Sequence, residues 1–203
     1  MSIYQESPAG RGKMRVIGGS VRGRPLAAFT GREIRPTPDR VREALFSILY
    51  SRRGPLIGCM VLDLFAGSGA LGIEALSRGA AQARFVEHSR QAIDTIRRNV
   101  QACGFDARAK VSFDDVWRAL PVLAGDGPYE LIFADPPYGR DLAPRLLQEI
   151  ERCRLLADDG LLCLETAPAD AVPDRAGSLQ LLDRRRYGAT MLHFYQLSPE
   201  ELA

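Results

Sequence analysis

The chain has 203 residues, of which 46% are hydrophobic and 26% charged, a composition typical of one soluble globular domain with at most a small appendage. No apolar run approaches the roughly 20 residues that a membrane helix needs. The first 13 residues also lack the apolar core of a secretory signal. We therefore expect a cytoplasmic protein with no membrane partner.

The cysteines are widely spaced, and the chain contains only two histidines that could help to bind a metal. Each cysteine lies beside or within an apolar segment, where cysteine is usually a small buried hydrophobe. The sequence therefore predicts neither a metal site, nor a disulfide framework, nor a catalytic thiol. The residues concerned are Cys59, Cys103, Cys153 and Cys163.

The net charge of +2 is unevenly distributed. Residues 1–53 contain eleven basic and four acidic residues, a net charge of +7, so the remaining residues carry −5. Arginine supplies 25 of the 27 basic residues, and its planar fork suits phosphate contacts. We divide the chain into a disordered tail at 1–13, a basic extension at 14–53 that meets a polyanion, and an acidic body at 54–203.

In chain order, residues 14–29 read as two short strands around glycine turns. The segment at 35–39 contains two prolines and ends the extended structure. The next segment, 40–50, has apolar residues at helical spacing and predicts an amphipathic helix. Its apolar positions are Val41, Leu45, Ile48 and Leu49.

From residue 59 onward, strand and helix patterns alternate. The predicted strands are 59–65, 83–87, 109–113, 129–134 and 160–165, and the predicted helices are 69–78, 91–103, a short helix that contains Trp117, and 141–153. Two adjacent strand-like runs, 178–187 and 189–197, follow around Gly188. This alternation predicts an α/β fold: a doubly wound, mostly parallel seven-stranded sheet with a terminal antiparallel hairpin.

A glycine-rich motif, Asp63-Leu-Phe-Ala-Gly67-Ser-Gly69-Ala-Leu-Gly72, follows the first of these strands and opens a helix. Glycines let the backbone turn sharply and approach a ligand, and the helix N-terminus offers free N–H groups. The spacing of Gly67, Gly69 and Gly72 also matches the dinucleotide fingerprint. At this point the motif is compatible with a nicotinamide enzyme, a methyltransferase or a structural turn.

Acidic residues at three strand ends favour a methyltransferase. Asp63 precedes the glycine loop, where its carboxylate can meet the amino group of a methionine moiety, whereas a pyrophosphate loop has no use for an anion there. Glu87 ends the second strand and can accept both ribose hydroxyls. After the third strand, Asp114 or Asp115 can reach an adenine amino group, and one of the two can instead cap the next helix.

The motif Asp135-Pro136-Pro137-Tyr138 follows the fourth strand directly. The two prolines hold the backbone extended and remove two N–H donors, so the Asp135 carboxylate and the Pro136 carbonyl remain as acceptors. Two acceptors that grip the hydrogens of an aromatic amino group would favour a pyramidal, nucleophilic nitrogen in line with a methyl donor. Tyr138 offers a face on which a base can stack.

Together the two motifs resemble those of the class I S-adenosylmethionine-dependent amino-methyltransferases. The stretches MRVIGGSVRGRPL (14–26) and REIRPTPDRVREALFSIL (32–49) further resemble the bacterial family that methylates the N2 atom of guanine 966 in 16S ribosomal RNA. The resemblance extends from about residue 14 to residue 197.

This resemblance implies a Rossmann-like fold with a small N-terminal hairpin and helix, S-adenosylmethionine as donor without a metal, and 16S rRNA or the small ribosomal subunit as partner. The implied donor-binding residues are Asp63, Phe65, Gly67, Ser68, Gly69, Glu87, Asp114 and Asp115. The implied catalytic residues are Asp135, Pro136, Pro137 and Tyr138. The arginines implied to face RNA are Arg15, Arg22, Arg24, Arg35 and Arg40.

Three alternatives remain on the residues alone. An adenine-N6 methyltransferase acting on DNA or RNA would use the same Asp135 motif, and only the N-terminal pattern disfavours it. An NAD-dependent oxidoreductase leaves Asp63 and the Asp135 motif without roles. A catalytically silent RNA-binding module would not need Asp135 at all.

Overall fold

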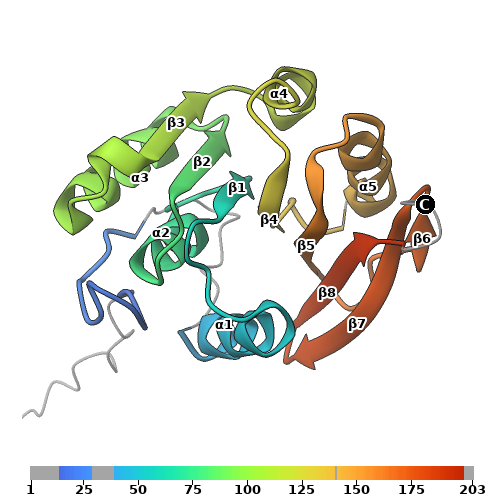
Figure 1. Cartoon of the computed structure of the whole chain (residues 1–203), viewed down its shortest axis with the longest axis horizontal. Coiled ribbons are helices and arrows are strands. Elements are labelled where there is room, and N and C mark those ends of the chain that lie inside the picture. The colour runs from blue at the N-terminus through green and yellow to red at the C-terminus, as the bar shows by residue number, and fades with distance from the viewer. Residues whose placement is uncertain (1–13, 29–38, 140, 199–203) are drawn as a thin grey trace, which may run out of the picture.

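The computed structural model describes residues 14–28, 39–139 and 141–198. Within these residues, eight strands form one sheet in the order β3-β2-β1-β4-β5-β8-β7-β6 (Figure 1). The first five strands in this order are parallel, whereas β8 is antiparallel to β5 and to β7. The predicted doubly wound sheet with a terminal antiparallel hairpin is confirmed.

The strands are β1 (Met60–Leu64), β2 (Gln82–Glu87), β3 (Ala109–Phe113), β4 (Tyr129–Ala134), β5 (Leu156–Thr166), β6 (Arg175–Ala176), β7 (Leu179–Tyr187) and β8 (Thr190–Leu197). The helices are α1 (Asp39–Arg53), α2 (Ala70–Ser77), α3 (Arg90–Cys103), α4 (Val116–Leu123) and α5 (Leu142–Arg152), with a short 3₁₀ turn η1 (Asp106–Arg108).

Helices cover both faces of the sheet, with α1, α2 and α3 on one face and α4 and α5 on the other (Figure 1). Alternate residues of each strand point to opposite faces, which accounts for two separate apolar clusters. In β4, Leu131 and Phe133 pack with the α1–α3 side, whereas Ile132 and Ala134 pack with the α4–α5 side. The central strands are buried on both faces, as their continuous apolar sequences predicted.

Strand order reverses between β1 and β4, because the chain proceeds from β1 to β2 and β3 on one side and from β4 to β5 on the other. In open α/β sheets, ligands bind at the carboxyl ends of the strands beside such a reversal. The glycine loop leaves β1 and the Asp135 motif leaves β4 at this edge. The topology therefore places both sequence motifs at one site.

Three sequence-based details differ from the structure. The sheet has eight strands and not seven, because the two-residue β6 pairs with β7 and is too short to leave a pattern. The strand predicted from residue 160 begins at Leu156, where a shift in register against β4 accommodates the polar residues before Gly160. Within residues 14–28, the two predicted strands are reduced to the bridge between Arg15 and Pro25 with a few backbone hydrogen bonds around it, because the backbone at 17–21 bonds to α2 instead.

The tail at 1–13 that we expected to be disordered, most of the proline segment at 35–39 and the RNA-facing Arg35 lie outside the described part of the chain. Cys59, Cys103 and Cys163 are buried as expected and Cys153 is partly buried. No helix in the described segments is long and apolar enough to span a bilayer.

We expect Gly72→Ala to destabilise the fold. An added Cβ would lie 2.4 Å from Cε1 of Phe85 on β2 and 3.2 Å from Oδ2 of Asp63, so α2 would have to move away from the sheet. Overpacking of this kind costs about 1–3 kcal/mol, measurable as a lower midpoint in chemical unfolding. Gly125→Ala is the matched control, because its Cβ would meet only the Val122 carbonyl oxygen at 3.6 Å. Equal stability of the two variants would contradict this packing argument.

Candidate active site

The loop between β1 and α2 reverses direction through three residues with positive φ. Phe65, Gly67 and Gly69 have φ values of 57°, 55° and 76°. Only glycine adopts this region without strain, which explains two of the three residues. The strain at Phe65 marks the loop as a site where backbone geometry is imposed by its surroundings. The ring of Phe65 packs edge-on against Trp117 of α4, with centroids 6.4 Å apart.

Asp63 lies at the end of β1, directly before this loop, and is 3% exposed. Its Oδ2 accepts a 2.9 Å hydrogen bond from the Gly72 N–H. Burial is the main cause that raises the pKa of Asp63 to about 8, and the Glu87 carboxylate adds to the shift. No basic side chain of the described segments forms an ion pair with Asp63 that would offset this burial. The site therefore contains a buried acid suited to a cationic ligand group.

Glu87 ends β2 and organises the backbone around it. One carboxylate oxygen accepts the N–H groups of His88 and Ser89, both at 2.8 Å, and the other accepts the Gly67 N–H at 3.0 Å. A carboxylate offers about four acceptor sites, so about one remains for a further donor. Acceptance of two ribose hydroxyls would require Glu87 to release one of its backbone bonds.

The two adjacent acids after β3 have different environments. Asp115 is the N-cap of α4, where its Oδ1 accepts the Trp117 N–H at 3.0 Å. Asp114 accepts the Asp115 N–H at 2.8 Å and lies 3.8 Å from the Arg118 guanidinium. The helix-capping role therefore falls to Asp115.

The Asp135 motif leaves β4 beside the glycine loop. Asp135 is partly buried, Pro136 is buried, and Pro137 and Tyr138 are exposed. Burial, together with the nearby carboxylates of Glu165 and Asp63, raises the pKa of Asp135 well above its usual range. The carboxyl ends of β1 and β4 thus bring Asp63 and Asp135 into one electrostatically coupled site.

Tyr138 is anchored by its hydroxyl group although its side chain is 39% exposed. The hydroxyl donates a 2.6 Å hydrogen bond to Oε1 of Glu165 at the end of β5, and Thr190 Oγ1 lies 3.4 Å away. Because Glu165 is only 5% exposed, it is a fixed anchor. The ring therefore stands at the protein surface in a defined orientation.

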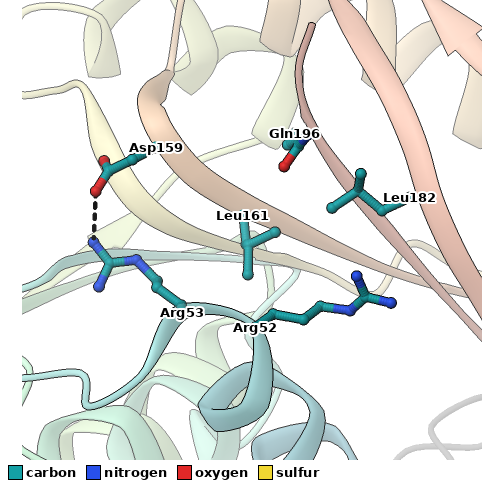
Figure 2. Close-up of a pocket in the computed structure, with 6 residues that line it drawn as sticks. All are labelled: Arg52, Arg53, Asp159, Leu161, Leu182 and Gln196. Atoms are coloured by element: carbon teal, nitrogen blue, oxygen red, sulfur yellow. Dashed lines mark ion pairs between the residues drawn. The ribbon is translucent and has the colours of Figure 1, made fainter. Parts of the chain in front are cut away.

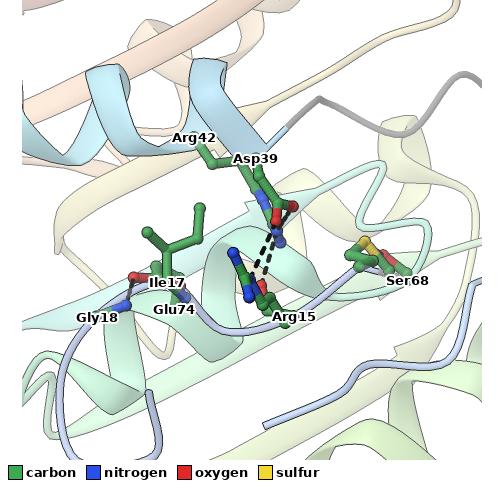
Figure 3. Close-up of polar contacts among 8 residues, drawn as sticks. Arg15, Ile17, Gly18, Asp39, Arg42, Ser68 and Glu74 are labelled. Atoms are coloured by element: carbon green, nitrogen blue, oxygen red, sulfur yellow. Dashed lines mark hydrogen bonds and ion pairs between the residues drawn. The ribbon is translucent and has the colours of Figure 1, made fainter. Parts of the chain in front are cut away.

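Buried polar side chains of α2 hold the start of the basic extension (Figure 3). Glu74 is fully buried, and its carboxylate accepts the N–H groups of Ile17 at 2.7 Å and Gly18 at 2.8 Å. The Arg78 guanidinium pairs with the same carboxylate at 2.7 Å. One turn further on, Ser77 donates to the Gly18 carbonyl at 2.6 Å. The N-terminal segment is thus docked on α2.

Asn99 of α3 connects this segment to the glycine loop. Its amide accepts the Ala27 N–H at 2.7 Å, donates to the Ala27 carbonyl at 3.1 Å and donates to the Ser68 carbonyl at 2.9 Å. The Ser68 hydroxyl lies 3.7 Å from the sulfur of Met14. Segment 14–28 is therefore connected to the loop that carries the candidate donor site, directly at Met14 and through Asn99 at Ala27.

Of the five arginines expected to face RNA, Arg15, Arg22, Arg24 and Arg40 are exposed, and Arg35 lies outside the described residues. Arg15 pairs with Asp39 at 3.6 Å (Figure 3). A hollow of about 200 Å³ lies between this segment and the start of α1 and is lined by Arg15 and Arg22. The exposed basic groups are thus available to a ligand outside the protein.

Comparison with known proteins identifies the family. The model of the family described as Conserved hypothetical protein 95 matches residues 14–196. This chain belongs to that family.

Members of the family and their structures match along most of the chain. The Bacillus subtilis protein YlbH is 38% identical over 185 residues, which are 90% of this chain and 98% of YlbH. Ribosomal RNA small subunit methyltransferase D of Escherichia coli K12 is 34% identical over 189 residues, which are 93% of this chain and 92% of that protein. The structure of yhhF from Escherichia coli has a TM-score of 0.77 at 34% identity and covers 92% of this chain and 99% of that one.

Four residues whose contacts shape the site of this protein were not singled out from the sequence. Glu165 lies at the carboxyl end of a strand, like the acids that were found, and its position was the available signal. Asn99 and Glu74 are polar residues on buried helix faces, which periodicity alone does not connect to distant backbone. Trp117, beside Phe65, was assigned only to a helix.

Asp63→Asn should make the stability of the ligand-free protein less dependent on pH. The pKa of Asp63 is about 8 in the fold against an ordinary value of 3.8, so the folded state holds its proton more tightly than the unfolded chain. This contribution to stability is present below about pH 4 and is lost as the pH rises toward about 8. Asparagine can accept the Gly72 N–H without ionising.

Melting temperatures of both proteins at about pH 5 and about pH 8 test this expectation. The variant should gain on the wild type as the pH rises. Identical pH dependence of the two proteins would contradict the raised pKa of Asp63.

Proposed function

We propose that the chain transfers a methyl group from S-adenosylmethionine to the exocyclic N2 atom of a guanine in 16S ribosomal RNA. The observation that carries this proposal is the Asp135-Pro136-Pro137-Tyr138 loop, which lies beside a glycine loop that follows a buried acid, Asp63. The Escherichia coli relative is named as a methyltransferase of small-subunit ribosomal RNA. Ribosomal RNA as substrate implies action in the bacterial cytoplasm.

The donor would bind across the carboxyl ends of β1, β2 and β3. Asp63 is suited to the cationic amino group of the methionine part, because a buried acid without an ion-pair partner in the described segments gains most from a cation. The same carboxyl group, when ionised, would repel a pyrophosphate, which disfavours a dinucleotide. We assign Phe65, Gly67, Ser68 and Gly69 to the loop around the methionine part.

The rest of the donor would meet the next two strand ends. We assign the ribose to Glu87, through the acceptor site that its backbone bonds leave. We assign the adenine to Asp114, since Asp115 is engaged as the cap of α4. The Phe65–Trp117 pair offers an apolar wall for a ring between these acids.

The base would stack on Tyr138, whose ring is held by Glu165. The Asp135 carboxylate and the Pro136 carbonyl would accept the two amino hydrogens. When bound, S-adenosylmethionine would supply a methyl group that the nitrogen displaces from sulfur, and the electron pair of the broken carbon–sulfur bond would stay on sulfur. The nitrogen would become cationic and lose a proton to the ionised form of Asp135, which the raised pKa makes a better proton acceptor.

Asp135→Ala should lower single-turnover methyl transfer by about 100-fold or more, a typical cost of removing one preorganised group at a reacting centre. Donor affinity should stay close to that of the wild type, because Asp135 is assigned to the acceptor base. The assay uses radiolabelled donor and ribosomal RNA from methylation-deficient cells, followed by nucleoside analysis, with donor titration in parallel. Product other than N2-methylguanosine would refute the proposed substrate, and wild-type turnover by the variant would remove Asp135 from the mechanism.

We further propose that residues 14–53 form the RNA-binding extension, through Arg15, Arg22, Arg24, Arg35 and Arg40, and that residues 54–203 form the donor-binding body. Val16 and Leu45 of the extension belong to the same apolar cluster as Val61 of β1. Deletion of the extension would therefore expose core, so point substitutions are the appropriate test.

The double variant Arg22→Ala with Arg24→Ala should bind RNA more weakly than the wild type. For each phosphate that is no longer neutralised, the slope of log affinity against log salt should decrease by about 0.7–0.9. Both residues are exposed and neither is assigned to the donor, so donor affinity is the internal control. Unchanged RNA affinity and slope would mean that these two arginines form only a solvated surface.

A further inference from the structure

We infer that the β7–β8 hairpin carries a second RNA-binding surface, beside the acceptor loop and across the site from residues 14–28 of the N-terminal extension. This hairpin surface consists of Arg184, Arg185 and Arg186 of β7 with Arg52 at the end of α1. The inference rests on the proposed function, because it assigns the surface to the same RNA substrate.

The register of the sheet brings the tip of this hairpin to the active-site edge. β8 runs antiparallel to β5, so its first residues lie where β5 ends: Thr166 pairs with Met191 and Glu165 with Leu192. Tyr187 and Thr190 form the last pair before the turn. A base stacked on Tyr138 would therefore have its sugar and phosphates close to this turn.

The side chain of Thr190 confirms that closeness. Its Oγ1 lies 3.4 Å from the Tyr138 hydroxyl and 3.4 Å from Oε1 of Glu165. The turn is thus in contact with the side chain on which the base would stack.

The hairpin surface has excess positive charge. Arg184, Arg185 and Arg186 are consecutive and exposed, and alternation along the strand sends them to both faces of the hairpin. Arg184 pairs with Asp174, and Arg186 donates to the Gly188 carbonyl at 3.1 Å. Among the described ion pairs, these four arginines share only two carboxylates, Asp174 and Asp183, which leaves a net charge of +2.

This basic cluster is notable because the body from residue 54 onward is net acidic, at −5. Such a body repels a polyanion except where basic groups gather. The guanidinium fork is suited to bidentate phosphate binding. RNA is therefore the ligand that this chemistry favours at a site beside a base-binding aromatic ring.

Asp183 joins the hairpin to α1. One of its oxygens accepts from Arg52 at 2.7 Å and from Arg185 at 2.9 Å. Beyond this junction, a hollow of about 420 Å³ lies between the end of α1 and strands β5, β7 and β8 (Figure 2). Figure 2 shows Arg53 paired with Asp159 on one side of the hollow and Arg52 extending beneath Leu182 of β7.

The two basic surfaces flank the acceptor loop. Segment 14–28 of the extension is docked on α2 and α3, whereas β7 and β8 lie beyond β5 in the sheet, and Figure 1 shows them on opposite sides of the central strands. An RNA strand that presents a base at the end of β4 can therefore be held on both sides of that base. A two-sided grip would orient the nucleotide as well as attract it.

The triple variant Arg184→Gln, Arg185→Gln, Arg186→Gln tests the surface. With protein-free 16S ribosomal RNA as the probe, we expect affinity to fall roughly tenfold or more and the salt slope to decrease by about 0.7–0.9 for each phosphate that is no longer neutralised. Donor affinity and melting temperature should match those of the wild type. The matched control is Lys110→Gln with Arg152→Gln, which removes exposed charges near the amino ends of β3 and β5, and it should bind RNA as the wild type does.

Asp183→Asn should change RNA affinity in the opposite direction to the triple variant. A folding defect would lower RNA affinity and could not produce this increase. Loss of this carboxylate releases Arg52 and Arg185, so RNA should bind more tightly and with a steeper salt dependence. The inference is overturned if the triple variant keeps the affinity and slope of the wild type, if the control weakens as much as the triple variant, or if Asp183→Asn does not bind more tightly.

Failure of this inference is distinguishable from failure of the proposed function. A wild-type protein that binds the RNA but transfers no methyl group would refute the proposed function and leave the hairpin surface supported by the binding data. A wild-type protein that methylates the RNA, with a triple variant that binds equally well, would refute only the hairpin surface.

Discussion

Four acidic side chains lie close together at the carboxyl ends of β1, β2, β4 and β5. The candidate site depends on how the protein and its ligands stabilise these largely buried acids. They belong to Asp63, Glu87, Asp135 and Glu165. Burial and the neighbouring carboxylates disfavour the ionised forms of Asp63 and Asp135 and raise the pKa values of both. Backbone N–H groups of the glycine loop and of the start of α3 offset part of this cost at Glu87. A cationic donor would offset more, so binding and proton release at Asp63 are expected to be linked.

Two buried polar side chains, Glu74 and Asn99, connect the same edge to the basic extension through hydrogen bonds. Glu74 is buried in α2, and its carboxylate accepts hydrogen bonds from the backbone N–H groups of residues 17 and 18. Asn99 binds residue 27 on one side and the Ser68 carbonyl on the other. If RNA binding shifted the extension, Asn99 would therefore transmit the shift to the glycine loop. This connection offers a direct physical route between the two ligands of the proposed reaction.

Charge is distributed so that attraction and chemistry are separated in space. Four acids, most of them buried, lie at the strand ends, whereas one group of exposed arginines lies on the N-terminal segment and another on the β7–β8 hairpin to the other side. Tyr138 stands between them with its hydroxyl bound to Glu165. The phosphates of a polyanion can bind these flanking arginines at a distance from the buried carboxylates. Only the base has to reach the carboxylates.

The sequence by itself determined the alternating strands and helices, the two motifs and the edge at which they meet, because periodicity, glycine spacing and the rule for parallel strand ends are local or topological properties. It left open which of Asp114 and Asp115 contacts the adenine and which caps the next helix, and the structure shows Asp115 capping α4. Only the tertiary structure decided that Glu165 and Thr190 hold Tyr138, that Glu74 and Asn99 hold the extension, and that the start of β8 lies beside the acceptor loop. These hydrogen bonds join residues 27 to 72 positions apart in the chain, and no local pattern records which distant strand end or backbone group a polar side chain will meet.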